Sequence, residues 1–275
     1  MVRRFAIAAA ASASLVAVAE PVGSTPDLVF SVTEGVTYQA TPKEIRDKFE
    51  PLAEVIGRAL RRNVKVVLVP GYDDARAGLR RQEYDIAFIH PAHVALEAVK
   101  SGRYQALAWT SGFTAYKVSL LCKEPQPIAD WKGIAGKGLV MPDADSITSV
   151  ITRAMLREHG LQPAALKLTN TRYQEAVPFY VQNGFAAYGA TAASGVVKTW
   201  KDGGGNVCAE SRPVPIKQWL ASRKLDAATA SAAREALLGL AQSDAGKRAL
   251  ATSTYTGFVA PSPEAETALM TWLGI

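Results

Sequence analysis

The sequence predicts an α/β fold with two lobes, each built on a mostly parallel sheet flanked by helices. Short apolar runs typical of buried strands alternate along the chain with longer stretches of helical periodicity. The chain has 275 residues, of which 48% are hydrophobic, and this is enough for two domains that each bury a core. We expect one lobe to comprise 20–114 plus 213–275 and the other 115–212.

Residues 1–19 have the pattern of a secretory signal peptide. Arg3 and Arg4 precede an apolar stretch over 5–18, and the small-residue sequence Ala-Val-Ala ends at Ala19. The apolar stretch is too short and too rich in alanine to span a bilayer comfortably. An uncleaved interfacial anchor is the alternative. We expect a soluble periplasmic protein, without stable membrane insertion after the signal is removed.

The first lobe is predicted to begin with a buried strand over 28–32, followed by a helix. Thr41 has the place of an N-cap, Pro42 that of the first helical residue, and Glu44 completes a capping box. Apolar residues then recur at spacings of three and four up to Leu60, which predicts one face packed on a sheet. The further elements expected here are strands over 64–69, 84–89 and 107–109 and helices over 73–81 and 92–100.

The second lobe is predicted to continue the same alternation. Strands are expected over 118–122, 139–141, 166–168, 186–188 and 207–208, and helices after Ser146 and, in the C-terminal third, over 227–245 and 263–273. Repeated strand and helix succession favours parallel sheets, in which ligands bind beyond the carboxyl ends of the strands.

The stretch 141–149 is the most informative candidate site. It runs from a strand end through Ser146, Thr148 and Ser149 into a helix. The first N–H groups of a helix have no partner within it and the helix dipole is positive there, so N–H and hydroxyl groups together can hold an oxyanion. Simple N-capping by Ser146 or Thr148 is the alternative.

Tyrosine and histidine side chains stand at other predicted strand ends. Tyr38 follows the first strand and Tyr116 begins the strand that enters the second lobe, so either phenol can donate to an anion or pack at the core edge. His90 ends a strand, where it can donate to an anion. His93 lies three residues further on, but a metal ion would need more ligands than these and His159 supply, so we expect no metal site.

Charge and motifs exclude several classes of function. The formal net charge is +6, without a run of Lys and Arg long enough to follow a nucleic-acid backbone. The sequence has no G-x-S-x-G elbow, Walker loop, G-x-G-x-x-G or H-E-x-x-H motif. We therefore expect a binding protein rather than an enzyme, without a cofactor. Cys122 and Cys208 either pair in an oxidising compartment or remain free.

Several segments in order resemble the phosphonate-, phosphite- and phosphate-binding components of ABC transporters, a type II periplasmic binding protein family. They are residues 84–92, 116–121, 128–133 and the helix start at 146–149 with Leu156 and Gly160. The resemblance implies two α/β lobes joined by two crossover strands and a ligand gripped in the cleft for delivery to a permease. We expect a monomer that binds phosphate, phosphite or a simple phosphonate.

The resemblance also assigns ligand-facing positions. The candidate ligand-binding residues are Tyr38, His90, Tyr116, Ser146, Ile147, Thr148, Ser149 and Tyr173. Ile147 replaces a hydroxyl residue usual in the family and offers only its backbone N–H, and Ser149 stands where glycine is common. Members that bind aminoalkylphosphonates offer a carboxylate at the place aligned with Ala187. An ammonium group would lack a partner there, so we expect a ligand without a cationic tail.

Three other functions remain compatible with the sequence. The same lobes can present a ligand to a sensor kinase or another membrane complex. They can bind another small solute, such as a sulfonate, a pyrimidine precursor or a metal chelate, because a fold does not determine function. An enzyme whose catalytic residues come from distant parts of the chain is the least favoured.

Overall fold

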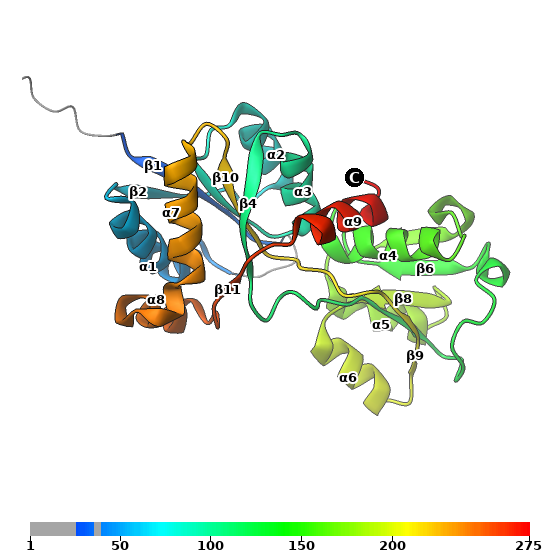
Figure 1. Cartoon of the computed structure of the whole chain (residues 1–275). Coiled ribbons are helices and arrows are strands. Elements are labelled where there is room, and N and C mark those ends of the chain that lie inside the picture. Colours follow the sequence, from blue (N-terminus) through cyan, green and yellow to red (C-terminus); the bar gives the residue numbers. More distant parts are fainter. Residues whose placement is uncertain (1–25, 36–39) are drawn as a thin grey trace, which may run out of the picture.

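The computed structural model describes residues 26–35 and 40–275, so the predicted signal peptide and Tyr38 lie outside the described residues. Two sheets, each flanked by helices, form two lobes (Figure 1). The predicted two-lobed α/β fold is thereby confirmed. No helix of the described residues has both the length and the apolar character needed to cross a membrane.

The first lobe contains a six-stranded sheet in the order β11-β4-β10-β3-β1-β2. Its elements are β1 (Leu28–Thr33), α1 (Pro42–Leu60), β2 (Val64–Leu68), α2 (Tyr72–Arg81), β3 (Ile86–Ile89), α3 (Ala92–Lys100), β4 (Tyr104–Thr110), β10 (Gln218–Ser222), α7 (Ala227–Leu238), η4 (Leu240–Gln242), α8 (Asp244–Ser253) and β11 (Phe258–Val259). Strand β1 pairs in parallel with β2 and β3, whereas β10 lies antiparallel between β3 and β4. The sheet is therefore mixed.

Local signals set the start of α1 as predicted. Thr41 is the N-cap, its side chain accepts from the N–H of Glu44, and the reciprocal bond of the capping box is present. Phe49, Leu52 and Ile56 of this helix are fully buried against the sheet. They belong to the same core cluster as Trp219 of β10, so a strand from the C-terminal part of the chain completes the core of the first lobe.

The second lobe contains a five-stranded sheet in the order β7-β6-β8-β5-β9. Its elements are β5 (Ser119–Cys122), η1 (Lys132–Ile134), β6 (Gly138–Met141), α4 (Ile147–Glu158), η2 (Pro163–Ala165), β7 (Lys167–Asn170), η3 (Gln174–Ala176), α5 (Val177–Gln182), β8 (Tyr188–Thr191), α6 (Ser194–Asp202) and β9 (Asn206–Glu210). Strand β6 is parallel to β7 and β8, and β5 is antiparallel to β8 and β9.

Some predicted elements differ from the structure, and others in the structure, among them α5, α6 and β11, were not predicted. The strand expected over 186–188 begins only at Tyr188, and the helix expected over 227–245 is divided into α7 and α8, with Gly239 as the C-cap of α7. Strand β10 was missed. Its segment is fully buried, but the apolar run in it is short and is preceded by Lys217 and Gln218, so it lacks the length of a typical strand signal.

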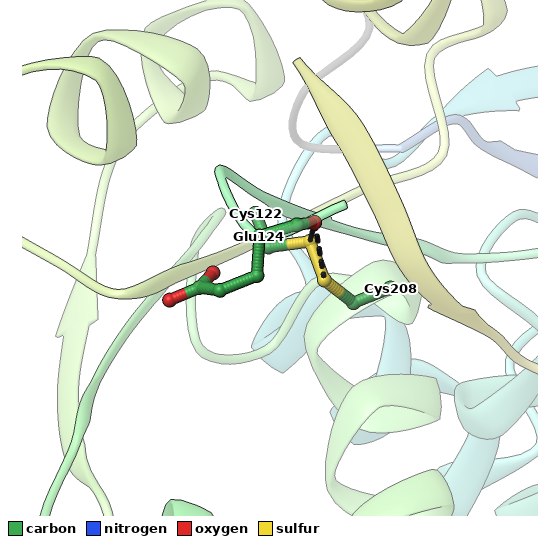
Figure 2. A group of neighbouring side chains, drawn as sticks. All are labelled: Cys122, Glu124 and Cys208. Atoms are coloured by element: carbon green, nitrogen blue, oxygen red, sulfur yellow. Dashed lines mark hydrogen bonds between the residues drawn. A yellow bond between two sulfur atoms is a disulfide. The ribbon is translucent and has the colours of Figure 1, made fainter. Parts of the chain in front are cut away.

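Two neighbouring crossover segments join the lobes. Tyr116 and Val214 form an antiparallel bridge, with N···O distances of 3.1 and 2.9 Å in the two directions. Further along, the Cys122–Cys208 disulfide connects β5 to β9, with the two Cα atoms 6.0 Å apart (Figure 2). The structure thus resolves the open question of the cysteines in favour of pairing.

The C-terminal helix α9 (Pro263–Leu273) packs on the second lobe. Leu269 and Leu273 share a core cluster with Ile151 of α4, and Arg157 of α4 donates to the carbonyl of Leu273 at 2.7 Å. The C-terminal segment therefore contacts both lobes (Figure 1). The division of the chain into lobes of 20–114 plus 213–275 and of 115–212 remains a proposal. It assigns α9 to the first lobe, whereas this helix packs on the second.

Candidate ligand-binding site

Polar side chains follow the carboxyl ends of two parallel strands in the first lobe. Glu34 comes directly after β1 and His90 directly after β3. The Nδ1 atom of His90 lies 3.2 Å from Oε2 of Glu34 and 3.2 Å from the backbone nitrogen of Gly35. A Cβ atom at position 35 would approach the imidazole to 2.9 Å. Glycine therefore allows the histidine to lie against this loop.

Two lysines surround the carboxylate of Glu34. The Nζ atom of Lys48 lies 3.3 Å from Oε1, and that of Lys217 lies 3.4 Å from Oε2. The side chains of Glu34 and Lys217 are only 4% and 5% exposed, so the charges interact with little screening by water. Lys217 precedes β10 directly, and its ammonium lies 4.3 Å from the ring centroid of Phe113 on the other crossover segment.

The protonation states leave this cluster with a net positive charge near neutral pH. Burial alone would raise the pKa of Glu34, but the hydrogen bond from His90 and the charge of Lys217 lower it to about 2. Burial lowers the pKa of Lys217 to about 8, against the opposing effect of Glu34. Burial also lowers the pKa of His90, which favours neutral imidazole. One carboxylate thus faces two lysines, Lys48 and Lys217.

In the second lobe the start of α4 is capped by its own hydroxyl groups. Ser146 is the N-cap and its Oγ accepts from the N–H of Ser149 at 3.2 Å. The hydroxyl of Ser149 donates to the carbonyl of Pro142 at 3.0 Å, and both serines are buried. Ser146 is therefore an N-cap, which was the alternative to a ligand donor. Both Ser146 and Ser149 have hydrogen-bond partners within the protein.

A second hydroxyl pair lies at the same helix start. The phenol oxygen of Tyr116 is 2.8 Å from Oγ1 of Thr148. Burial raises the pKa of Tyr116, so its phenol stays protonated and able to donate. The side chain of Ile147 is buried in the core, which leaves its backbone N–H as the polar group it can offer. The structure thus brings three of the candidate residues, Tyr116, Ile147 and Thr148, together.

Gln174 is a polar residue that the sequence analysis missed. Its Oε1 accepts from the backbone N–H of Ala192 at 2.6 Å and from the hydroxyl of Thr191 at 3.1 Å. The side chain of Gln174 also acts on the phenol of Tyr116, since it opposes the rise that burial causes in the pKa of that phenol. It therefore fixes the carboxyl end of β8 beside the hydroxyl pair. A lone glutamine in a one-turn helix carries no sequence signal for this role.

A family model described as ABC transporter, phosphonate, periplasmic substrate-binding protein matches residues 35–265. This chain belongs to that family. Members of this family are periplasmic substrate-binding components of ABC transporters, as the resemblance implied. The match spans both lobes and both crossover segments.

Solved structures with the same fold include other binding proteins. XAC2383 from Xanthomonas citri, bound to ATP, has a TM-score of 0.71 at 16% identity over 91% of this chain and 96% of that one. PhnD1 from Prochlorococcus marinus, in complex with methylphosphonate, has a TM-score of 0.64 at 13% identity, over 90% of this chain and 96% of that one. The sulphonate-binding protein SsuA from Escherichia coli has a TM-score of 0.55 at 15% identity, over 90% of this chain and 89% of that one. No curated protein matches the chain.

Ala187, which the resemblance aligns with the carboxylate of the aminoalkylphosphonate-binding members, lies at the amino end of β8. Ala187 precedes β8, and its N–H donates to the carbonyl of Gly138 at the amino end of β6. Ligands in this fold bind at the opposite, carboxyl ends of such strands. At the carboxyl end of β8 stand Thr191 and two alanines, so that position offers a hydroxyl and backbone groups without a carboxylate.

Tyr173 and His93 have other side chains as partners. Tyr173 is half-buried beyond the carboxyl end of β7, with the guanidinium of Arg172 5.1 Å from its ring centroid. The Nε2 atom of His93 lies 3.1 Å from Oδ1 of Asp145, whereas His90 contacts Glu34. The two histidines thus have different partners.

One group of potential metal ligands occurs among the described residues, formed by Cys122, Glu124 and Cys208. Its two sulfur atoms are bonded to each other (Figure 2). A disulfide has no thiolate to offer a metal ion. A cavity of about 590 Å³ lies elsewhere, between α5 and α6, and none of the predicted ligand-binding residues lines it.

Proposed function

We propose that this protein captures a small phosphorus oxyanion, namely phosphate, phosphite or an alkylphosphonate without a cationic tail, and delivers it to an ABC importer. The observation that carries the proposal is the Tyr116–Thr148 hydroxyl pair at the first turn of α4. This pair uses one hydroxyl proton in its own hydrogen bond and keeps the other to donate. Together with the first backbone N–H groups of a helix, that hydroxyl suits an anion with several oxygen atoms.

The positive cluster of the first lobe supports this choice. Tyr116 and Phe113 lie on one crossover segment, and Val214 and Lys217 lie on the other. The pairing of these segments links the hydroxyl pair of one lobe to the lysines of the other. An anion between them would meet neutral donors on one side and the field of two lysines around one carboxylate on the other.

The same cluster argues against an ammonium group on the ligand. Glu34 is the buried carboxylate near these residues, and it already contacts Lys48, Lys217 and His90. A second cation there would be repelled by the lysines, and one without a partner would be costly to bury.

Calorimetric titration of the mature protein tests the ligand class. Phosphate, phosphite and methylphosphonate are compared with 2-aminoethylphosphonate, sulfate and methanesulfonate. We expect at least one simple phosphorus oxyanion to bind more tightly than every other compound. Tightest binding of 2-aminoethylphosphonate or of a sulfonate would reject the proposed ligand. Phosphorus NMR after prolonged incubation should show the bound compound unchanged, whereas turnover would reveal an enzyme.

The role in import has its own test. The protein should stimulate the ATPase activity of the permease and ATPase of its own transporter in proteoliposomes when the ligand is present. Stimulation of a sensor kinase instead would assign the same ligand to signalling.

A further inference from the structure

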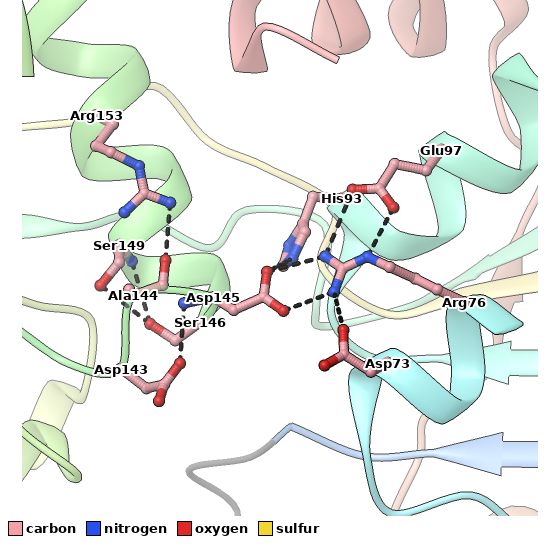
Figure 3. A network of polar contacts seen from close by, with 10 residues as sticks. All are labelled: Asp73, Arg76, His93, Glu97, Asp143, Ala144, Asp145, Ser146, Ser149 and Arg153. Atoms are coloured by element: carbon pink, nitrogen blue, oxygen red, sulfur yellow. Dashed lines mark hydrogen bonds and ion pairs between the residues drawn. The ribbon is translucent and has the colours of Figure 1, made fainter.

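An ion pair connects the two lobes directly, at the loop that leads into α4. Arg76 of α2, in the first lobe, donates from Nη1 to Oδ2 of Asp145 at 2.7 Å and from Nη2 to Oδ1 at 2.8 Å. Figure 3 shows the guanidinium of α2 facing this carboxylate across the boundary between the lobes. Two parallel hydrogen bonds between guanidinium and carboxylate form the strongest and most directional type of ion pair.

Other first-lobe side chains hold the pair in place. Glu97 of α3 accepts from Nε of Arg76 at 2.8 Å, so the guanidinium is oriented from behind. His93 of the same helix lies 3.1 Å from Oδ1 of Asp145 and its side chain is only 4% exposed. The Arg76 side chain is 18% exposed, so this contact is more sheltered from water than a typical surface ion pair.

Apolar contacts lie next to the ion pair. Helix α3 has two buried faces: Val94 belongs to the core of the first lobe, whereas Ala92 and Leu96 share a core cluster with Ile147 and Ile151 of α4. Separating α3 from α4 would expose these side chains and leave a partly buried charge without its partner.

We propose that Arg76, His93 and Asp145 form a latch that holds the lobes together and fixes the start of α4 against the first lobe. Asp145 directly precedes Ser146, the N-cap of α4. A change in its position therefore shifts the first turn that carries Thr148. The latch holds the lobes with or without a ligand, and only its effect on affinity rests on the proposed function.

Small-angle X-ray scattering of the mature protein without ligand tests the latch. The latch variants are Asp145→Asn, Arg76→Gln and the double variant. Asp47→Asn and Arg58→Gln are matched controls, because each removes an exposed ion pair within α1 alone. We expect a larger radius of gyration for the latch variants than for the wild type, and no change for the controls. The double variant should have a radius of gyration close to that of the single variants, because each of the three breaks the ion pair between Arg76 and Asp145.

An unchanged radius of gyration in folded latch variants would overturn the proposal. Circular dichroism establishes folding, and Asp145→Asn carries the test if Arg76→Gln does not fold, because Asp145 is 42% exposed. Titration with inorganic phosphate and methylphosphonate gives a second measurement, in which we expect a roughly two- to tenfold loss of affinity. If these two anions and phosphite all fail to bind the wild type, the proposed function fails while the scattering result still decides the latch.

Discussion

The phenol oxygen of Tyr116 lies 2.8 Å from Oγ1 of Thr148, which joins a crossover segment to the first turn of α4. Tyr116, at the beginning of the second lobe, thereby contacts the helix start that the sequence analysis proposed as a candidate site. Neighbouring serines serve the helix itself, since Ser146 caps it and Ser149 bonds to the carbonyl of Pro142. Single variants of Thr148 and Ser146 can therefore separate ligand binding from stabilisation of the helix.

The hydroxyl of Thr148 should contribute to anion binding. We expect Thr148→Val to weaken binding of a phosphorus oxyanion by about 1.5–3 kcal/mol, because a hydrogen bond to a charged group is lost. Thr152→Val is the matched control, since its buried hydroxyl bonds to the carbonyl of Thr148 within the same helix. Calorimetric titration of both variants measures the difference, and equal affinities would move the site away from Thr148.

Ser146 should act on stability. Ser146→Ala removes the N-cap of α4, and we expect a loss of about 1 kcal/mol in the free energy of unfolding. Urea denaturation without ligand measures this loss. A large fall in affinity with unchanged stability would instead make Ser146 a ligand donor, as the sequence predicted.

Glu34 should make stability depend on pH in the acid range. Its pKa is about 2 in the folded protein against an ordinary value of 4.5, so its contribution is present above pH 4.5 and is lost as the pH falls toward 2. The full contribution is on the order of 3 kcal/mol. Glu34→Gln should flatten the pH dependence of the unfolding free energy, whereas Glu54→Gln, on the exposed face of α1, should keep it.

Lys217 should affect both stability and affinity in the alkaline range. Because its pKa is lowered to about 8, the cost of burying its charge is present below pH 8 and disappears as the pH rises toward 10.5. The same loss of charge should weaken anion binding between pH 7 and 9. Lys217→Met, titrated with the same anion at each pH, should lack this change. An identical pH profile in both proteins would exclude Lys217 from the site.

The Cys122–Cys208 disulfide should stabilise the second lobe. It closes a segment with a sequence separation of 86 residues, and such a crosslink is worth roughly 2–4 kcal/mol. The double variant Cys122→Ser with Cys208→Ser should unfold at lower urea, and dithiothreitol should reproduce this shift in the wild type. The bridge lies between strands that are already paired. The ligand affinity of the double variant should stay within about twofold of the wild-type value, because distant sites are nearly independent.

Local features of the fold followed directly from the sequence. The capping box at Thr41, the bounds of α3 and α9, and the helix start after Ser146 depend on residues close together in the chain. Hydrophobic periodicity and caps report such short-range preferences. The resemblance to the family was likewise recognised from short segments that occur in a fixed order.

Tertiary structure decided which charges meet. Lys217 and Glu34 are 183 residues apart, and Arg76 and Asp145 are 69 apart, yet each pair is in contact. Lys217 reaches the first lobe because the chain returns from the second lobe as β10, the strand that was missed. Spacing within a sequence carries no information on such contacts, since they arise only when separate segments bury their apolar faces together. The amino-acid sequence thus determined the fold and family, and the packing of the lobes determined the charged cluster and the latch.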